Sequence, residues 1–347
     1  MRAIAFSQVA SQVVFGVLVV ALLAHGFEGA RQYAWFTVVN AGLGAAITMV
    51  LAWRRGLPQV RLDRAALWRR LKASLPIGIS FAMIQVYYSI DSVLLGYLKD
   101  TEAVGQYAVA YRVPLGVFAF AAIWVAVVYP HASAMFVKDP ERLRRQVQTF
   151  ASYSVALALP LGVGATFAGR GLMQELFGSE YGPATTPFIL LMWAIAVTLV
   201  SVNFGNVLLG AGDERRYAVG VTVGAVVNVA LNFILIPPAG TAGSAIATIA
   251  SELAVVAYMV RRFTVVLGPV RLDWGRVARA AAASAVMAGV LIALSDAVDP
   301  ALKVAIGAAV YVIAALGFGV VTREELRAIR RERGAGAADD DSVGSHG

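Results

Sequence analysis

Long apolar stretches alternate with short polar breaks along most of this chain. Many of the stretches approach the length of about 20 residues that a helix needs to cross a bilayer. From Asn203 to Leu253, for example, the breaks GAGDERR and PPAGTAG separate apolar runs of that kind. The pattern predicts an all-α integral membrane protein, because spanning helices satisfy their own backbone inside lipid. We expect about ten transmembrane helices, at residues 3–24, 31–53, 74–98, 104–130, 147–169, 186–210, 216–236, 241–260, 277–295 and 301–321.

Composition supports this prediction and removes several classes of function. Hydrophobic residues make up 59% of the chain, charged residues 14%, and the mean hydropathy is +0.72, which is too apolar for an ordinary soluble protein. The chain has no cysteine, its three histidines are scattered, and no phosphate-binding loop occurs. We therefore expect no catalytic residues, no metal site and no cofactor other than a coupling proton or sodium ion.

Basic residues gather in every second loop. Of the 29 Lys and Arg residues, 24 fall on one side of the predicted membrane and four on the other, with Arg112 inside a span. Cytoplasmic loops retain positive charge, so this split predicts an even number of spans with both termini in the cytoplasm. The net charge of +8 then reflects membrane topology, and we expect no nucleic-acid partner.

Two charged residues in neighbouring spans have similar predicted depths. Asp91 precedes the end of its span by a distance of about 10 Å, and Arg112 follows the start of the next span by about 12 Å. Inserting a charged side chain this deep in the membrane costs roughly 2.5 to 3.5 kcal/mol of free energy. The side chains of Asp91 and Arg112 should therefore pair with each other or face water. A structural ion pair and the charged wall of a substrate cavity both fit this pattern. Asp91 is also a candidate for taking up a proton or sodium ion.

Glu252 lies near the middle of span 241–260, and no basic residue of that span neutralises it. Three interpretations remain open for this carboxyl group: protonation in place, pairing with another helix, and coupling to an ion.

Polar and small residues also mark one face of each of two other spans. Gly220, Gly224, Asn228 and Asn232 recur at intervals of four, which predicts close helix packing with interhelical hydrogen bonds. Contact with a substrate is the alternative for the two asparagines. Ser80, Tyr87 and Asp91 share a helical face, and Tyr88 adjoins it.

One four-residue sequence occurs twice. Val-Arg-Leu-Asp stands at residues 60–63 and again at 270–273, six predicted spans apart, which indicates a six-helix internal repeat of the kind found in transporters. After the first copy, Asp63 is a predicted helix N-cap. We expect a short interfacial helix there, with Leu67, Trp68 and Leu71 on its apolar side and basic residues at the lipid headgroups.

Two longer segments resemble a known family. LPIGISFAMIQVYYSIDSVLLGYLKDTEAVGQYAVAYRV at residues 75–113 and LLGAGDERRYAVGVTVGAVVNVALNFILIPPAGTAGSAIAT at 208–248 are similar to the polysaccharide-transporter branch of the multidrug, oligosaccharidyl-lipid and polysaccharide (MOP) exporter superfamily. The resemblance covers about residues 1–321. It implies flipping of undecaprenyl-diphosphate-linked oligosaccharide across the bacterial cytoplasmic membrane, for synthesis of O-antigen, capsule or exopolysaccharide.

The resemblance also implies a division of the chain, because members of the family have two six-helix lobes, often followed by two extra helices. The implied segments are the last two helices of an incomplete N-terminal lobe at 1–55, a basic interfacial linker at 56–73, a six-helix C-terminal lobe at 74–262, a linker and two additional helices at 263–321, and a disordered cytoplasmic tail at 322–347. About four N-terminal helices are thus expected to be missing.

Candidate roles follow from the same likeness. Arg112 is a candidate contact for phosphate or sugar, because a guanidinium group suits phosphate geometry. The other candidate substrate contacts are Tyr87, Tyr88, Asn228 and Asn232, and the candidates for ion coupling are Asp91 and Glu252. The implied partners are the lipid-linked oligosaccharide, membrane lipids, and a polysaccharide polymerase with other glycan-assembly proteins.

Two alternative functions remain open at this point. One is an ion-coupled multidrug exporter of the same superfamily, in which the acids are essential and Arg112 is dispensable. The other is a truncated, non-transporting membrane scaffold in a glycan-assembly complex. Transport requires Asp91, Arg112 and Glu252 to border a watery space, and it is disfavoured if each is sealed among dry side chains or points at lipid tails with no shared void.

Overall fold

The structure is a computed structural model that describes residues 15–17, 30–54, 63–294 and 298–321. The chain divides into two compact units, Met1–Leu71 and Lys72–Gly347. Throughout the described residues the regular structure is helical, as the hydropathy pattern predicts. The predicted span 3–24 falls almost entirely outside the described residues, and the predicted tail 322–347 falls wholly outside them.

The first unit contains α2 (Ala30–Arg54), at the predicted span 31–53. Asp63 caps the next helix as predicted, because its Oδ1 accepts a hydrogen bond from Ala65 N at 2.9 Å. The interfacial helix expected after this cap is not a separate element. Instead α3 runs from Arg64 to Leu98, since residues 64–75 are rich in strong helix formers and contain no glycine or proline that would stop it.

The second unit continues with helices that overlap the remaining predicted spans. Six helical segments of the described chain are long and apolar enough to cross a membrane. The elements are α4 (Thr101–Lys138), α5 (Pro140–Phe177), the short η1 (Ser179–Ala184), α6 (Thr185–Gly210), α7 (Glu214–Leu267), α8 (Trp274–Ala293) and α9 (Pro300–Gly317).

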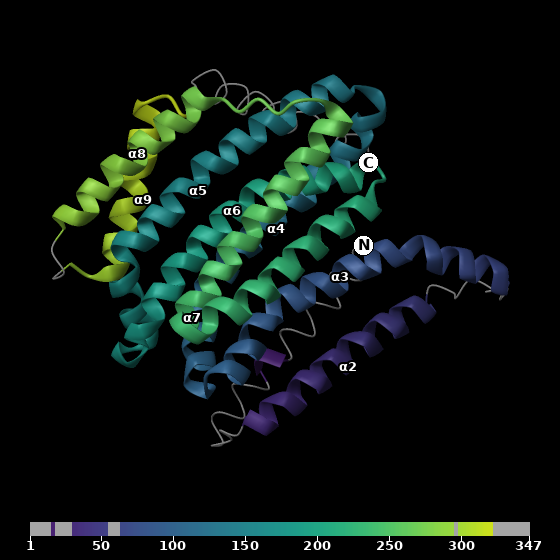
Figure 1. The fold of residues 1–347 in the computed structure, drawn as a ribbon, viewed down its shortest axis with the longest axis horizontal. Coiled ribbons are helices and arrows are strands. Elements are labelled where there is room, and N and C mark those ends of the chain that lie inside the picture. The colour runs from purple at the N-terminus through teal and green to yellow at the C-terminus, as the bar shows by residue number, and fades with distance from the viewer. Residues whose placement is uncertain (1–14, 18–29, 55–62, 295–297, 322–347) are drawn as a thin grey trace, which may run out of the picture. The chain divides into compact units, whose positions relative to one another are not determined.

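Helix α6 lies at the centre of the second unit, where it packs against α4, α5 and α7. Apolar side chains fill these contacts, including an edge-to-face pair of Phe204 and Phe263 whose ring centroids are 5.3 Å apart. Helices α8 and α9 pack against each other and against α5, and Figure 1 shows them side by side. They therefore join the unit on the α5 side.

Helix α7 is a hairpin of two antiparallel helices and not one straight element. The chain reverses at Gly240, whose φ of 56° and ψ of −131° are non-helical and which suit glycine alone. A Cβ atom on Gly220 would meet Tyr258, and one on Gly224 would meet Val255. Because the contacting residue numbers rise on one arm as they fall on the other, the arms run in opposite directions. This confirms the break predicted between spans 216–236 and 241–260.

Contacts among the turns at one end of the second unit agree with the predicted sorting of loops. Lys99 Nζ, between α3 and α4, donates to Pro237 O at the hairpin turn over 2.9 Å. Ala301 N, at the start of α9, donates to Glu175 Oε2 near the end of α5 over 3.0 Å. All four residues belong to the side that carries few basic residues.

The opposite end gathers loops from the basic side. Arg262, near the end of α7, lies 3.9 Å from Asp213, which precedes α7. Asp273 N, just before α8, donates to Ser152 Oγ in the first half of α5 over 3.1 Å. These contacts agree with the two sets of loops that the charge pattern predicts.

Candidate functional site

Asp91 of α3 accepts three hydrogen bonds inside the second unit. Tyr107 Oη of α4 donates to its Oδ2 at 2.7 Å, and Thr248 Oγ1 of α7 donates to the same atom at 2.9 Å. Asn232 Nδ2 of α7 donates to Oδ1 at 2.7 Å. The residue is only 4% exposed. All three donors are neutral side chains, so among the described residues this carboxyl group is held by hydrogen bonds without a basic partner.

A continuous run of hydrogen bonds joins Asp91 to Glu252. Beyond Asp91, Asn232 Nδ2 donates to Asn228 Oδ1 at 3.0 Å, and Asn228 Nδ2 donates to Ser251 Oγ at 3.5 Å. Ser251 Oγ lies 3.0 Å from Tyr87 Oη, which donates to Glu252 Oε1 at 3.0 Å. We call this run the polar chain; its members are Asp91, Asn232, Asn228, Ser251, Tyr87 and Glu252.

Close helix packing brings the members of the polar chain together. The arms of α7 approach closely at Gly220 and Gly224, where an added Cβ would lie 2.6 Å from Met259 Cε and 2.4 Å from Val255 Cγ2. One and two helical turns beyond Gly224, Asn228 and Asn232 are fully buried and occupy the same face. The prediction of glycine packing with interhelical hydrogen bonds from asparagine is confirmed.

Five of the seven predicted site residues lie in the polar chain, but Arg112 and Tyr88 do not. Arg112 is exposed on α4, and no ion pair joins it to Asp91 in the described part of the chain. Tyr107 supplies the contact from α4, and Arg112 follows it by five residues, which places it roughly 140° further around the helix. Tyr88 is half-buried, and its ring packs at 5.8 Å from that of Tyr87.

The two acids, Asp91 and Glu252, are buried, whereas Arg112 is exposed. Asp91 and Glu252 are 4% and 7% exposed. They therefore lie buried where α3, α4 and α7 meet, and they do not form the exposed wall of a cavity. Of the three charged residues expected to border water, only Arg112 is exposed. The coupling and substrate-binding roles of these residues remain predictions.

Sequence reasoning missed Tyr107, which is only 2% exposed. A signal for it exists, because Tyr107 lies about 9 Å along α4 from Thr101, close to the predicted depth of Asp91. A tyrosine near a helix end is common at membrane interfaces, so the residue type alone did not mark it as a partner of a buried acid.

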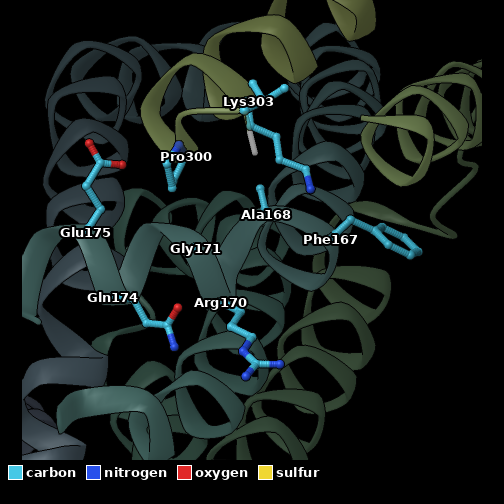
Figure 2. A pocket seen from close by; sticks show the side chains of 9 residues that line it. Phe167, Ala168, Arg170, Gly171, Gln174, Glu175, Pro300 and Lys303 are labelled. Atoms are coloured by element: carbon cyan, nitrogen blue, oxygen red, sulfur yellow. The ribbon is translucent and has the colours of Figure 1, made fainter. Parts of the chain in front are cut away.

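A cavity of about 580 Å³ lies away from the polar chain, where α5 meets the start of α9. Figure 2 shows Pro300 and Lys303 approaching Gly171 of α5 from α9, with Arg170 and Gln174 extending from α5. None of the predicted site residues lines this cavity. It therefore belongs to the junction of α5 with α9 and not to the predicted site.

A family model described as "Polysaccharide biosynthesis protein" matches residues 1–186, more than half of the chain. The chain belongs to this family. The matched region of the polysaccharide biosynthesis protein family includes Asp91, Tyr107 and Arg112, and membership confirms the resemblance to the MOP superfamily.

Curated relatives are similar over part of their length. The probable low-salt glycan biosynthesis flippase Agl15 of Haloferax volcanii is 25% identical over 207 residues, which are 59% of this chain and 44% of the relative. The probable flippase AglR of the same organism is 29% identical over 170 residues, 48% of this chain and 35% of that protein. The matches thus span less than half the length of these relatives.

The lipid II flippase MurJ in an inward closed conformation has a similar solved structure. The TM-score is 0.71 at 15% sequence identity, and the match covers 93% of this chain and 68% of MurJ. At this identity the match establishes the fold alone. The chain therefore combines membership of the polysaccharide biosynthesis protein family with a flippase-like multi-pass membrane fold.

Proposed function

We propose that this protein flips an oligosaccharide linked to undecaprenyl diphosphate across the bacterial cytoplasmic membrane, for assembly of O-antigen, capsule or exopolysaccharide. Family membership supports a role in polysaccharide biosynthesis, and two relatives bear the name of probable flippases. The proposal places both termini in the cytoplasm and includes membrane lipids, a polymerase and other glycan-assembly proteins as partners.

The observation that carries the proposal is the exposure of Arg112 inside a predicted membrane span. The residue lies about 16 Å along α4 from Thr101, and its side chain is exposed from the second unit. An arginine at such depth rarely faces lipid and usually borders a water-filled space or a bundle interior. Its forked guanidinium group matches a diphosphate. We infer that it contacts the diphosphate of the substrate.

The polar chain supports coupling to a proton or sodium ion. Two buried acids are joined through neutral side chains, and Asn232 Oδ1 is buried without a hydrogen-bond partner among the described residues. Oxygen atoms of carboxyl and amide groups are the ligands that hard cations prefer. The proposed roles are therefore ion uptake at Asp91 and Glu252, and substrate contact at Arg112 with Tyr87 and Tyr88. Asn228 and Asn232 are fully buried, so their role is the hydrogen bonding of the polar chain and not the predicted substrate contact.

The test is transport by the full chain in liposomes that contain a fluorescent lipid-linked oligosaccharide. The measured quantity is the rate at which the label becomes accessible to a membrane-impermeant quencher. Arg112→Ala should lower this rate by about tenfold or more, because a charged hydrogen bond to phosphate is lost, and Arg112→Lys should restore part of it. Arg215→Ala is the control, since Arg215 is an exposed arginine in the first turn of α7.

Three results would change the conclusion. Equal rates for Arg112→Ala and the unaltered protein would remove the role of Arg112. Efflux of a cationic drug that depends on Asp91 and Glu252 but not on Arg112 would favour the multidrug exporter. Loss of glycan assembly in cells on deletion of the chain, with no flipping in liposomes, would favour the scaffold.

A further inference from the structure

A second cavity, of about 240 Å³, lies at the basic end of the second unit, where α5 begins and α8 follows α7. It is separate from both the polar chain and the cavity at α9. We call it the arginine pocket; its lining residues are Arg145, Gln148, Thr149, Ser152, Arg271, Asp273 and Arg276.

The charge of the arginine pocket favours an anion. Three arginines line it against a single acid, Asp273. A fourth arginine, Arg279 of α8, lies 3.9 Å from the same acid. Arginine donates in a planar fork that matches phosphate, often through two hydrogen bonds at once. The pocket therefore has the hydrogen-bond donors that a phosphate group needs. Its arginines outnumber its single acid, so its net charge is positive.

Arg276 is fixed before any ligand binds. Its side chain is only 9% exposed, and its Nε lies 3.4 Å from Asp273 Oδ2. The guanidinium carbon lies 4.0 Å from the centroid of the Tyr153 ring, a cation–π contact. Asp273 Oδ1 also accepts a hydrogen bond from Arg276 N at 2.9 Å and so caps α8. Binding therefore costs little side-chain entropy at this residue.

Two hydrogen bonds hold the segment before α8 against α5. Gln148 Nε2 donates to Pro269 O at 3.0 Å, and Asp273 N donates to Ser152 Oγ at 3.1 Å.

The hydrogen bond that Asp273 accepts from Arg276 N lowers the pKa of the Asp273 carboxyl group below its usual range, and the positive charge of Arg276 acts in the same direction. The acid that orders the pocket thus stays ionised at neutral pH.

The repeated Val-Arg-Leu-Asp sequence gains an explanation here. Asp63 and Asp273 each cap the helix that follows them, so capping accounts for the aspartate in both copies. Capping does not account for the arginine. In the second copy, Arg271 is exposed and lines the arginine pocket, which gives that arginine a separate role.

The position of the pocket matches the level of lipid headgroups. Trp274, next to the pocket at the start of α8, is 71% exposed, and exposed tryptophans of membrane proteins concentrate at the membrane–water interface. We propose that the arginine pocket binds the phosphate of a lipid headgroup with net negative charge, in the leaflet at the basic end of the bundle. An anionic phospholipid and the diphosphate of a lipid-linked glycan both carry this chemistry; only the second source depends on the proposed function.

The experiment measures thermal stability of the purified full chain in detergent as lipid is added. The probes are phosphatidylglycerol, phosphatidylcholine as the zwitterionic reference, and farnesyl diphosphate as a short diphosphate lipid. The test variant is Arg145→Gln with Arg271→Gln, because both side chains are exposed and Arg276, which supports the fold, is left in place. The control variant is Arg142→Gln with Arg215→Gln, which removes two exposed arginines from the same end outside the pocket.

We expect phosphatidylglycerol or farnesyl diphosphate to raise the melting temperature of the unaltered protein and of the control. The test variant should need about tenfold more of the same probe. A response to phosphatidylglycerol identifies a phospholipid site, and a response to farnesyl diphosphate alone identifies a diphosphate site. The proposal is overturned if neither probe acts on the unaltered protein, if phosphatidylcholine acts equally, or if both double variants lose the response equally.

The liposome flipping assay separates this proposal from the proposed function. If the test variant loses the phospholipid response but flips the glycan normally, the pocket is a lipid site independent of transport. If flipping fails in the unaltered protein while the phospholipid response persists, the proposed function falls and the pocket remains.

Discussion

Asp91 has a set of partners that allows its charge to be tested without disturbing the packing. An asparagine at position 91 can still accept from Asn232 with its oxygen, while the hydroxyls of Tyr107 and Thr248 turn to accept from its amide, since hydroxyls both donate and accept. We expect Asp91→Asn to fold normally and to abolish the dependence of flipping on a proton or sodium gradient. The measurement is flipping rate in liposomes with and without each gradient.

A matched acid outside the polar chain provides the control for this experiment. Glu141 is exposed near the start of α5, so Glu141→Gln should retain the full gradient dependence. Gradient-driven flipping by Asp91→Asn would show that this carboxyl group is only a structural hydrogen-bond acceptor.

Single residues were predictable where a polar side chain interrupts an apolar run. Asn228, Asn232 and Glu252 stood out for this reason, and the structure places them in one network. The partner of Asp91 was not predictable in the same way, because depth along a helix can be counted from sequence while the direction of a side chain depends on how helices rotate against each other. Arg112 and Tyr107 differ in that direction, and only the packed structure distinguishes them.

At the scale of elements, the hairpin α7 depends on the absence of a side chain at Gly224. A Cβ there would lie 2.4 Å from Val255 Cγ2, and β-branched valine has little rotamer freedom in a helix to move away. We expect Gly224→Ala to lower the free energy of unfolding by about 1–3 kcal/mol. Thermal unfolding of the purified protein in detergent measures the effect.

Two further variants show whether the contact itself is responsible. Gly289 of α8 is exposed, and an added Cβ would meet nothing within 4 Å, so Gly289→Ala should be neutral or stabilising by up to about 1 kcal/mol. In a double variant, Val255→Ala removes the opposing methyl groups, and the total loss should be smaller than the sum of the single losses. Strict additivity would contradict the proposed clash.

Element boundaries followed from sequence where a specific residue ends the helix. The reversal in α7 occurs at Gly240, within the break that the hydropathy pattern predicted. The start of α3 was harder, because the change from basic to apolar residues near position 74 marks a change of surroundings and not the end of a helix. A polar-to-apolar transition therefore locates the membrane surface more reliably than it locates a helix boundary.

At the scale of the whole molecule, the two ends of the second unit differ in charge. The basic end holds the arginine pocket, and the opposite end holds the cavity beside Arg170 and Lys303. Neither cavity includes the polar chain. Headgroup recognition and ion uptake are therefore assigned to different parts of the second unit, which is why variants of the pocket and of Asp91 are expected to affect different measurements.

The sorting of loops predicts which residues reagents can reach from each side of the membrane. Because the natural chain has no cysteine, a single introduced cysteine is the only target for a membrane-impermeant maleimide. Ser179→Cys in η1 should be labelled in intact cells, and Glu141→Cys should be labelled only after the membrane is permeabilised, since retained positive charge marks the cytoplasmic side. Both side chains are exposed, so unequal labelling would reflect topology and not burial. The reverse pattern would invert the proposed orientation, and it would move the arginine pocket to the outer leaflet, where a substrate made in the cytoplasm could reach it only after flipping.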